Sequence, residues 1–164
     1  MKKEMQQQQT AVFLLRITLG VIILATWYKN LNDGLYTANG LIGFFNWLFD
    51  PQNGNGSTLA WYNAFLQTAV VPIAGPFAVF QMIGEFLLGL ALLFGAFTRL
   101  FGLIAMFFFA NLFFSYFGGH EWIWTYVLLF MSALTIFLTA AGRRLGVDQW
   151  LVQSRNDSKL SILW

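Results

Sequence analysis

The hydrophobic positions of this chain gather into long apolar runs that polar segments separate. The four longest runs are residues 11–28, 77–97, 100–117 and 122–141. A helix rises about 1.5 Å per residue, so about 20 apolar residues cross the roughly 30 Å of hydrocarbon in a bilayer. The pattern therefore predicts four membrane-spanning helices.

The connections between these runs predict how the helices are arranged. Residues 98–99 and 118–121 are long enough only to reverse the chain, so the last three helices should pack as antiparallel neighbours. The expected fold class is an all-α membrane protein, a four-transmembrane-helix antiparallel bundle in a single domain that covers residues 1–164.

A long segment, residues 30–76, separates the first two spans and is expected to form an outer cap. Its apolar stretch at residues 41–49 is far too short to cross a membrane, which favours a helix lying at the interface. The Pro, Gly and Asn residues of 50–56 are typical of a turn. Ser57 or Thr58 is then expected to cap a second short interfacial helix that Pro72 ends.

Composition agrees with the lipid bilayer as the main solvent and excludes several kinds of chemistry. The chain is 58% hydrophobic and 10% charged, whereas about 25% of a typical soluble domain is charged. It has no Cys and one His, which excludes thiolate metal sites, thiol redox chemistry and a haem held by two of its own histidines. We therefore expect no metal site and no covalently bound cofactor. The basic residues form no stripe beside stacking aromatics, so nucleic acid is not an expected partner.

The distribution of Lys and Arg predicts the orientation in the membrane. Seven of these residues flank the spans on the side of the amino terminus, and only Lys29 lies on the other side. Cytoplasmic loops are enriched in Lys and Arg. Both termini, including a tail of residues 142–164, are therefore expected on the cytoplasmic side of the cell (inner) membrane. The cytoplasmic basic residues are Lys2, Lys3, Arg99, Arg143, Arg144, Arg155 and Lys159.

Glu85 falls near the middle of the second span, where a carboxylate costs about 2.5–3.5 kcal/mol on insertion. The apolar residues around it offset that cost, but the side chain must still face the interior of the bundle or a polar partner. Asn111 on the third span lies at the same level, since both residues are roughly 18–20 Å from the inner face. Arg16 on the first span either reaches toward Glu85 or extends to the cytoplasmic headgroups, and the sequence leaves both open.

Two interpretations of this polar group remain open. In the first, Glu85 stabilises the packing of the helices, either protonated or paired with Arg16 or Asn111. In the second, Glu85 binds a polar ligand headgroup or handles a proton. Aromatic residues near the outer surface are best explained as an interfacial belt. The alternative is an aromatic pocket for a planar headgroup under the outer cap, with Trp27 and Lys29 as candidate contacts.

Small, charged and aromatic residues recur at characteristic spacings from the first span to the carboxy-terminal tail. They are Arg16, Gly20, Lys29, Trp61, Tyr62, Phe65, Leu66, Val71, Pro72, Gly84, Glu85, Gly89, Gly95, Thr98, Arg99, Gly142, Arg143 and Asp148. With them the chain resembles the DoxX/DoxD-like membrane proteins over residues 14–151. The resemblance implies a four-span subunit that works near the quinone pool with partner proteins. In the DoxD members this is the membrane subunit of thiosulfate:quinone oxidoreductase.

The first functional hypothesis is the membrane subunit of a quinone-linked oxidoreductase, with the thiosulfate:quinone type as one candidate. In it Arg16 supplies positive charge, Glu85 a proton or hydrogen bond and Asn111 orientation in a quinone pocket. Electron transfer then uses a bound organic cofactor, the quinone itself or a partner subunit. The alternative is a non-catalytic accessory subunit of a larger respiratory or photosynthetic membrane complex. A small permease is a third hypothesis.

Overall fold

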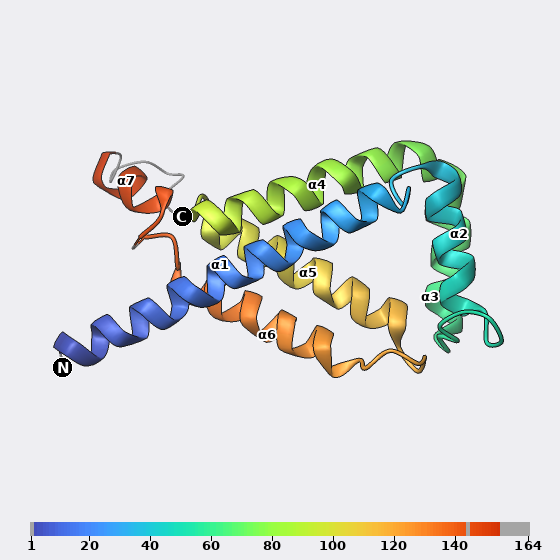
Figure 1. Cartoon of the computed structure of the whole chain (residues 1–164), viewed down its shortest axis with the longest axis horizontal. Helices are drawn as coiled ribbons and strands as arrows, with labels where there is room; N and C mark the ends of the chain where they lie inside the picture. Colours follow the sequence, from blue (N-terminus) through green and yellow to red (C-terminus); the bar gives the residue numbers. More distant parts are fainter. Residues whose placement is uncertain (1, 144, 155–164) are drawn as a thin grey trace.

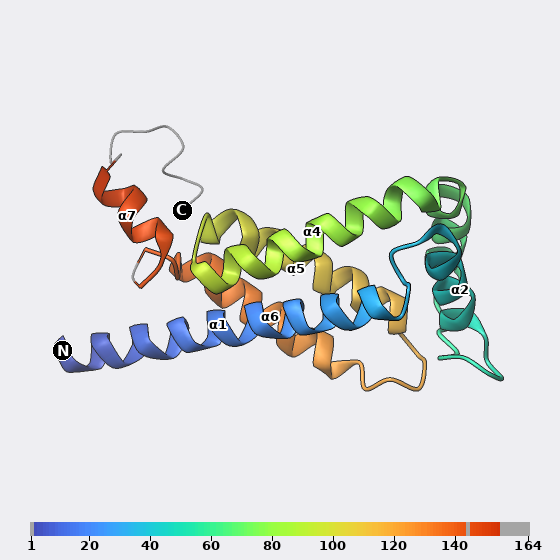
Figure 2. The ribbon, with the colours of Figure 1, turned by 45° about the horizontal axis from the view of Figure 1, so that its top comes forward.

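The computed structural model describes residues 2–143 and 145–154, with side chains from residue 7 onward. Within these ranges the chain forms helices and no β-strand, which confirms the all-α prediction. Four long helices run back and forth along one axis (Figures 1 and 2). They are α1 (Lys2–Asn32), α4 (Ala74–Phe94), α5 (Thr98–Tyr116) and α6 (Trp124–Thr139).

The long helices pack in two close pairs. α1 lies along α4, and α5 lies along α6. α1 also contacts α6. The interface between α4 and α5, here named the α4–α5 seam, is less extensive than these three helix interfaces. Gly20 makes the α1–α4 contact close, because a Cβ at this position would lie 2.8 Å from the backbone nitrogen of Leu93. Small residues of this kind let helix backbones approach where lipid provides no hydrophobic drive.

By length and composition, part of the described chain is suited to a membrane. The segments Gln7–Asn32, Ala60–Phe94 and Thr98–Tyr116 are long and apolar enough to cross one, and Trp124–Thr139 is apolar but shorter. Large apolar side chains also point outward from the bundle: Phe80 and Phe107 are each 70% exposed and Leu138 is 65% exposed. An apolar exterior of this extent is expected where lipid is the solvent.

The bounds of α1 and α6 differ from the predicted spans. α1 begins at Lys2 instead of residue 11, because the leading Lys, Glu, Met and Gln residues are good helix formers and nothing there breaks the helix. α6 covers only Trp124–Thr139, and Ala140 ends it in the left-handed conformation with φ +46°. The helix is thus two residues shorter at each end than the apolar run of residues 122–141.

The outer cap contains two short helices, as predicted. α2 (Ala38–Phe49) and α3 (Ala60–Phe65) lie across one end of the bundle in Figure 1. They share an apolar cluster with the start of α4, formed by Leu41, Phe45, Leu48, Tyr62, Leu66, Val70, Ala74 and Ala78. The cap is thus packed onto the bundle by its own hydrophobic core.

The predicted capping of α3 was wrong. Leu59 occupies its N-cap position without a side-chain hydrogen bond. The Ser57 hydroxyl instead donates to the carbonyl of Ser115 at 2.6 Å, and the Thr58 hydroxyl donates to the carbonyl of Phe117 at 3.3 Å. These residues fasten the cap to the end of α5, a role that depends on tertiary contacts.

Pro72 bends the chain without ending the helical segment. Leu66–Val70 forms a π-helical turn and Val71–Ile73 a 3₁₀ turn, and these lead directly into α4. Proline has no backbone N–H and its ring collides with the carbonyl four residues earlier. Widened and tightened turns around Pro72 accommodate both effects, and the chain changes direction there (Figure 1).

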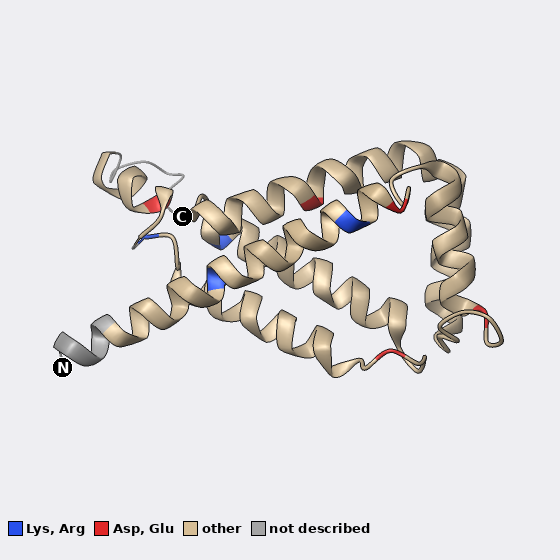
Figure 3. Ribbon diagram, viewed as in Figure 1, with Lys and Arg blue, Asp and Glu red and all other residues tan. Residues whose placement is uncertain are grey.

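Most charged residues lie toward the two ends of the bundle, and Glu85 lies near the middle of α4 (Figure 3). Arg99 and Arg143 lie at the end that holds α7 (Val147–Ser154), which is the short helix of the tail. Asp33, Asp50 and Glu121 lie at the end covered by α2 and α3. The predicted cytoplasmic residues Arg144, Arg155 and Lys159 lie outside the described residues.

Candidate functional site

The carboxyl group of Glu85 lies inside the bundle, within a cluster of polar side chains. The residue is 4% exposed. Gln81, one turn earlier on α4, donates from Nε2 to Oε1 of Glu85 at 2.7 Å. Tyr36, from the loop between α1 and α2, donates its hydroxyl to Oε2 at 2.7 Å. This confirms that Glu85 faces inward and has polar partners.

Tyr36 connects the outer cap to the centre of α4. It is 8% exposed, and Asn30 near the end of α1 hydrogen-bonds with both Tyr36 and Glu85. Burial raises the pKa of Tyr36, and the neighbouring Glu85 raises it further. The phenol therefore stays protonated at neutral pH and remains a hydrogen-bond donor.

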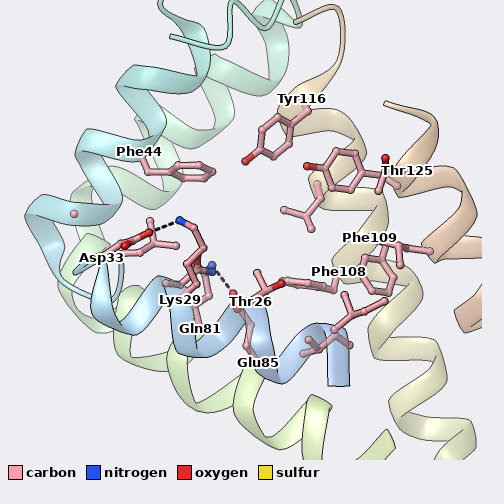
Figure 4. Close-up of a pocket in the computed structure, with 18 of the residues that line it drawn as sticks. Thr26, Lys29, Asp33, Phe44, Gln81, Glu85, Phe108, Phe109, Tyr116 and Thr125 are labelled. Carbon is pink, nitrogen blue, oxygen red and sulfur yellow. Dashed lines mark hydrogen bonds and ion pairs between the residues drawn. The ribbon is translucent and has the colours of Figure 1, made fainter. Parts of the chain in front are cut away.

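A cavity of about 600 Å³, here named the outer chamber, opens above Glu85 (Figure 4). Helices α1, α2, α4, α5 and α6 all contribute to its lining. Glu85 and Gln81 give it a polar base, while Lys29 and Asp33 of α1 and the following loop form an ion pair at its edge. Its walls combine aliphatic, polar and aromatic side chains, and the aromatic ones include Phe44, Trp47, Phe108, Tyr116 and Tyr126.

A second cavity of about 300 Å³, here named the side chamber, lies among α3, α4 and α5. Its lining is largely apolar and includes Phe65, Phe80, Gly84 and Ile104. The two chambers adjoin at Glu85, since residues that line both are Phe44, Gln81, Glu85, Phe108 and Leu112. The buried carboxyl group is therefore reached from two sides.

Asn111 lines the side chamber together with Glu85, so the structure brings these two predicted site residues to one cavity. Its Oδ1 nevertheless accepts a hydrogen bond from the hydroxyl of Tyr62 on α3 rather than from Glu85. Ser115, one turn further along α5, donates to the carbonyl of Asn111 at 2.9 Å and approaches the Tyr62 hydroxyl at 3.4 Å. Pairing with Asn111 was one of the alternatives considered for Glu85, and the structure instead shows a contact of Asn111 with Tyr62 that fastens the cap to α5.

Arg16 lines neither chamber. Its side chain is 1% exposed and points to the opposite end of the bundle, where Nη2 donates to the carbonyl of Leu145 at 2.8 Å. Nη1 lies 3.5 Å from the carbonyl of Ala141, and Asp148 on α7 provides the nearest opposite charge. Arg16 thus neither reaches Glu85 nor extends to lipid headgroups, because backbone carbonyls of its own chain bind it.

Asp148 is the centre of a hydrogen-bonded cluster at this end, here named the inner knot. It is fully buried and accepts hydrogen bonds from the backbone nitrogen of Phe97 at 2.5 Å and from that of Thr98 at 2.8 Å. The Thr98 hydroxyl donates to it at 2.7 Å and accepts from the nitrogen of Gly142 at 3.0 Å. The nitrogen of Asp148 donates to the carbonyl of Gly95 at 3.0 Å.

The inner knot accounts for several residues that carry the resemblance described above. Arg16, Gly95, Thr98, Gly142 and Asp148 come from three separate stretches of the chain yet share this one cluster. It joins α1, the α4–α5 turn, the end of α6 and α7. These residues hold the bundle together at the end remote from the two chambers.

The two remaining predicted contacts occupy different positions. Lys29 lines the outer chamber and forms an ion pair with Asp33, with both side chains well exposed. Trp27 is half-buried and lines neither described chamber: its Nε1 donates to the carbonyl of Met82 at 3.0 Å and its ring packs 4.7 Å from that of Phe86. Trp27 fastens α1 to α4.

Three residues of the site were missed in the sequence. Gln81 had a local signal, since it precedes Glu85 by four residues and must share its helix face. Tyr36 had none, and Tyr62 was noted only among the residues of the resemblance, because their partners lie in other elements, 49 residues away in both cases. Only the folded chain shows these contacts.

The fold and the site together define an all-helical protein with helices suited to a membrane and a buried acid between two chambers. Within residues 2–143 and 145–154, no three His, Asp or Glu side chains are grouped so that they could hold a metal ion. No known protein family matches the chain, and no curated protein or solved structure shows significant similarity to it.

Proposed function

We propose that this chain is a four-span protein of the cytoplasmic membrane that binds a quinone headgroup at Glu85. It would act as the DoxX/DoxD-like membrane subunit of a quinone-linked oxidoreductase. The observation that carries the proposal is the buried carboxyl of Glu85, held by Tyr36 and Gln81 at the base of a chamber of about 600 Å³ that has several aromatic rings in its walls. Chambers of about 300–1,000 Å³ with a few convergent polar groups are typical of small-molecule sites.

The division of charge supports an orientation with both termini in the cytoplasm. Arg99 and Arg143 lie at the α7 end, whereas Lys29 lies toward the capped end and is paired there with Asp33 (Figure 3), in agreement with the enrichment of Lys and Arg in cytoplasmic segments. α6 would be the fourth span. Its 16 residues extend about 24 Å, and Trp122 and Trp124 at its outer end, 67% and 58% exposed, suit an aromatic belt at the interface.

The lining of the outer chamber suits a planar ring that carries carbonyl groups. Phe44, Phe108 and Tyr116 present aromatic surface to the ring. Gln81 has a second N–H besides the one that binds Glu85, and Glu85 in its protonated form donates to a carbonyl oxygen. The hydroxyl of Tyr36 holds the Glu85 carboxyl in place. A bound quinone supplies the two-electron redox chemistry, which no side chain of this protein performs by itself. The role of the chain is to orient the ring and to hold a proton at the Glu85 carboxyl.

A partner subunit would deliver the electrons. Among the described residues no three His, Asp or Glu side chains are grouped so that they could bind a metal ion, and the chain has no Cys to bind an iron–sulfur cluster. The resemblance suggests thiosulfate as one candidate electron donor. The accessory role, in which the same cluster only stabilises the bundle, is the alternative that an experiment must distinguish.

The substitution Glu85→Gln tests this proposal because it keeps the shape of the side chain and removes its acidic proton. Binding of a tailless benzoquinone to the purified protein in mild detergent would be measured by calorimetry. We expect Glu85→Gln to weaken binding at least tenfold, or about 1.4 kcal/mol. Glu121→Gln, a matched change at an exposed site outside both chambers, should leave binding unchanged.

The accessory role predicts a different result. Glu85→Gln would then lower only the thermal stability of the protein or its co-purification with partner subunits, and benzoquinone would bind neither form. Mass spectrometry of co-purifying proteins and of extracted quinones gives this second readout.

A further inference from the structure

We infer that the side chamber is the passage by which the hydrocarbon tail of a membrane-dissolved quinone leaves the headgroup site, sideways into the bilayer between α4 and α5. This inference rests on the proposed function, and it identifies the substrate as a tailed, membrane-dissolved quinone that arrives from the lipid rather than from water.

The first observation is that the side chamber is continuous with the headgroup site. Both chambers are lined by Glu85, Gln81 and Phe108, so a molecule held at Glu85 can extend into either. The outer chamber has the Lys29–Asp33 ion pair at its edge, which is a polar surface unsuited to a hydrocarbon tail. The side chamber is the apolar direction out of the site.

The second observation is that the side chamber reaches the surface that faces lipid. Three of its lining residues are large apolar side chains that are substantially exposed: Phe65 is 48%, Phe80 is 70% and Ile104 is 41% exposed. They come from α3, α4 and α5, around the seam where α4 and α5 are least closely packed. A tail in this seam passes directly from protein to acyl chains.

The third observation concerns Gly84, which precedes Glu85 on α4 and lines the side chamber. A Cβ added at this position would meet no atom within 4 Å. No close helix contact therefore requires glycine here, unlike at Gly20. Glycine instead keeps the wall of the side chamber free of a side chain next to the carboxyl.

The physical role of the passage is steric rather than attractive. Lipid solvates a hydrocarbon tail as well as an apolar protein wall does, so the tail gains little affinity from the side chamber. If the passage is blocked, however, a tailed quinone cannot seat its headgroup, while a tailless one still can. The two probes should therefore respond differently to the same obstruction.

The test compares decylubiquinone with its tailless parent, a dimethoxy-methyl-benzoquinone, on the full-length protein in detergent micelles. Gly84→Phe fills the side chamber from α4, and Gly43→Phe is the matched control, since Gly43 also has nothing within 4 Å and lines neither chamber. The affinity of each variant for a probe is divided by the affinity of the unsubstituted protein for the same probe. The effect of the probe's partitioning into the detergent micelle then cancels from the ratio. We expect Gly84→Phe to weaken the binding of decylubiquinone at least tenfold and to weaken the binding of the tailless probe less than about twofold.

A second substitution blocks the side chamber from another helix, so that a distortion of α4 caused by Gly84→Phe can be distinguished from loss of the passage. Ile104→Trp narrows the chamber from α5, and Ile83→Trp places the same side chain at an exposed position of α4 outside the lining. Ile104→Trp should reproduce the selective loss of decylubiquinone binding, and Ile83→Trp should not.

Two outcomes overturn the inference. One is equal weakening of both probes by variants whose thermal transitions match that of the unsubstituted protein, which would make the side chamber part of the headgroup site. The other is undiminished binding of decylubiquinone in both obstructed variants. Failure of the proposed function looks different: the unsubstituted protein would then bind neither probe, and the inference would fall with it.

Discussion

The hydroxyl of Tyr36 donates a hydrogen bond of 2.7 Å to the carboxyl of Glu85, although 49 residues separate the two in the chain. Tyr36 belongs to the loop that leads into the outer cap, and Glu85 lies near the middle of α4. The contact therefore couples the position of the cap to the polar group at the base of the outer chamber. A ligand that binds Glu85 must compete with this contact or share it.

Removal of the Tyr36 hydroxyl should destabilise the protein. Tyr36→Phe leaves one oxygen of the buried carboxyl without its donor, and such a loss costs about 1–3 kcal/mol. Thermal or denaturant unfolding in detergent would show the decrease. Tyr28→Phe is the control, because Tyr28 is 63% exposed, and should change stability by less than about 0.5 kcal/mol. Equal stability of the two variants would contradict the importance of the hydrogen bond.

Asp148→Asn should lower the stability of the protein more than Asp33→Asn, the matched change at an exposed aspartate. It removes the buried charge opposite Arg16 and replaces an acceptor oxygen with an N–H donor that faces other donors. Loss of one partner of a buried charged cluster costs about 3–5 kcal/mol. Asp33→Asn, in the exposed pair with Lys29, should cost less than about 1 kcal/mol. Unfolding of both variants in the same detergent gives the comparison.

Replacement by alanine should have opposite effects on stability at two glycines, Gly95 at the end of α4 beside the inner knot and Gly84 within α4. Gly95 has φ +70°, and a Cβ there would overlap the guanidinium of Arg16. Gly95→Ala should therefore cost roughly 1–2 kcal/mol for the backbone conformation alone, and more for displacing Arg16. Gly84→Ala meets open space within a helix, so it should be neutral or stabilise by up to about 1 kcal/mol. Similar melting temperatures for the two variants would contradict the contribution of the inner knot to the stability of the protein.

The absence of cysteine makes the orientation directly measurable. Single cysteines are placed at two exposed positions, Gln52→Cys in the outer cap and Ser154→Cys at the end of α7. An impermeant maleimide should label the Gln52→Cys variant only in right-side-out membrane vesicles and the Ser154→Cys variant only in inside-out vesicles. Three proposed spans, α4, α5 and α6, separate the two positions, so labelling of both from the same side would refute this odd number of spans.

Much of the secondary structure could be predicted because hydropathy is a property of consecutive residues. Apolar runs locate α1, α4, α5 and α6, and the short apolar stretch at residues 41–49 locates α2. The errors arose where distant contacts or backbone geometry intervened. Ser57 and Thr58 bind the end of α5 instead of capping α3, and Pro72 lies within a bent helical segment that cap packing stabilises.

The sequence by itself determined that Glu85 must turn inward, because an acid in an apolar span cannot remain against lipid. Only the tertiary structure decided its partners: Tyr36 and Gln81 hold Glu85, Tyr62 holds Asn111, and the carbonyl of Leu145 holds Arg16. The physical reason is that burial of a polar group demands some partner, which hydropathy reveals. Which group supplies the hydrogen bond depends on how loops and helix ends, distant along the chain, meet in space.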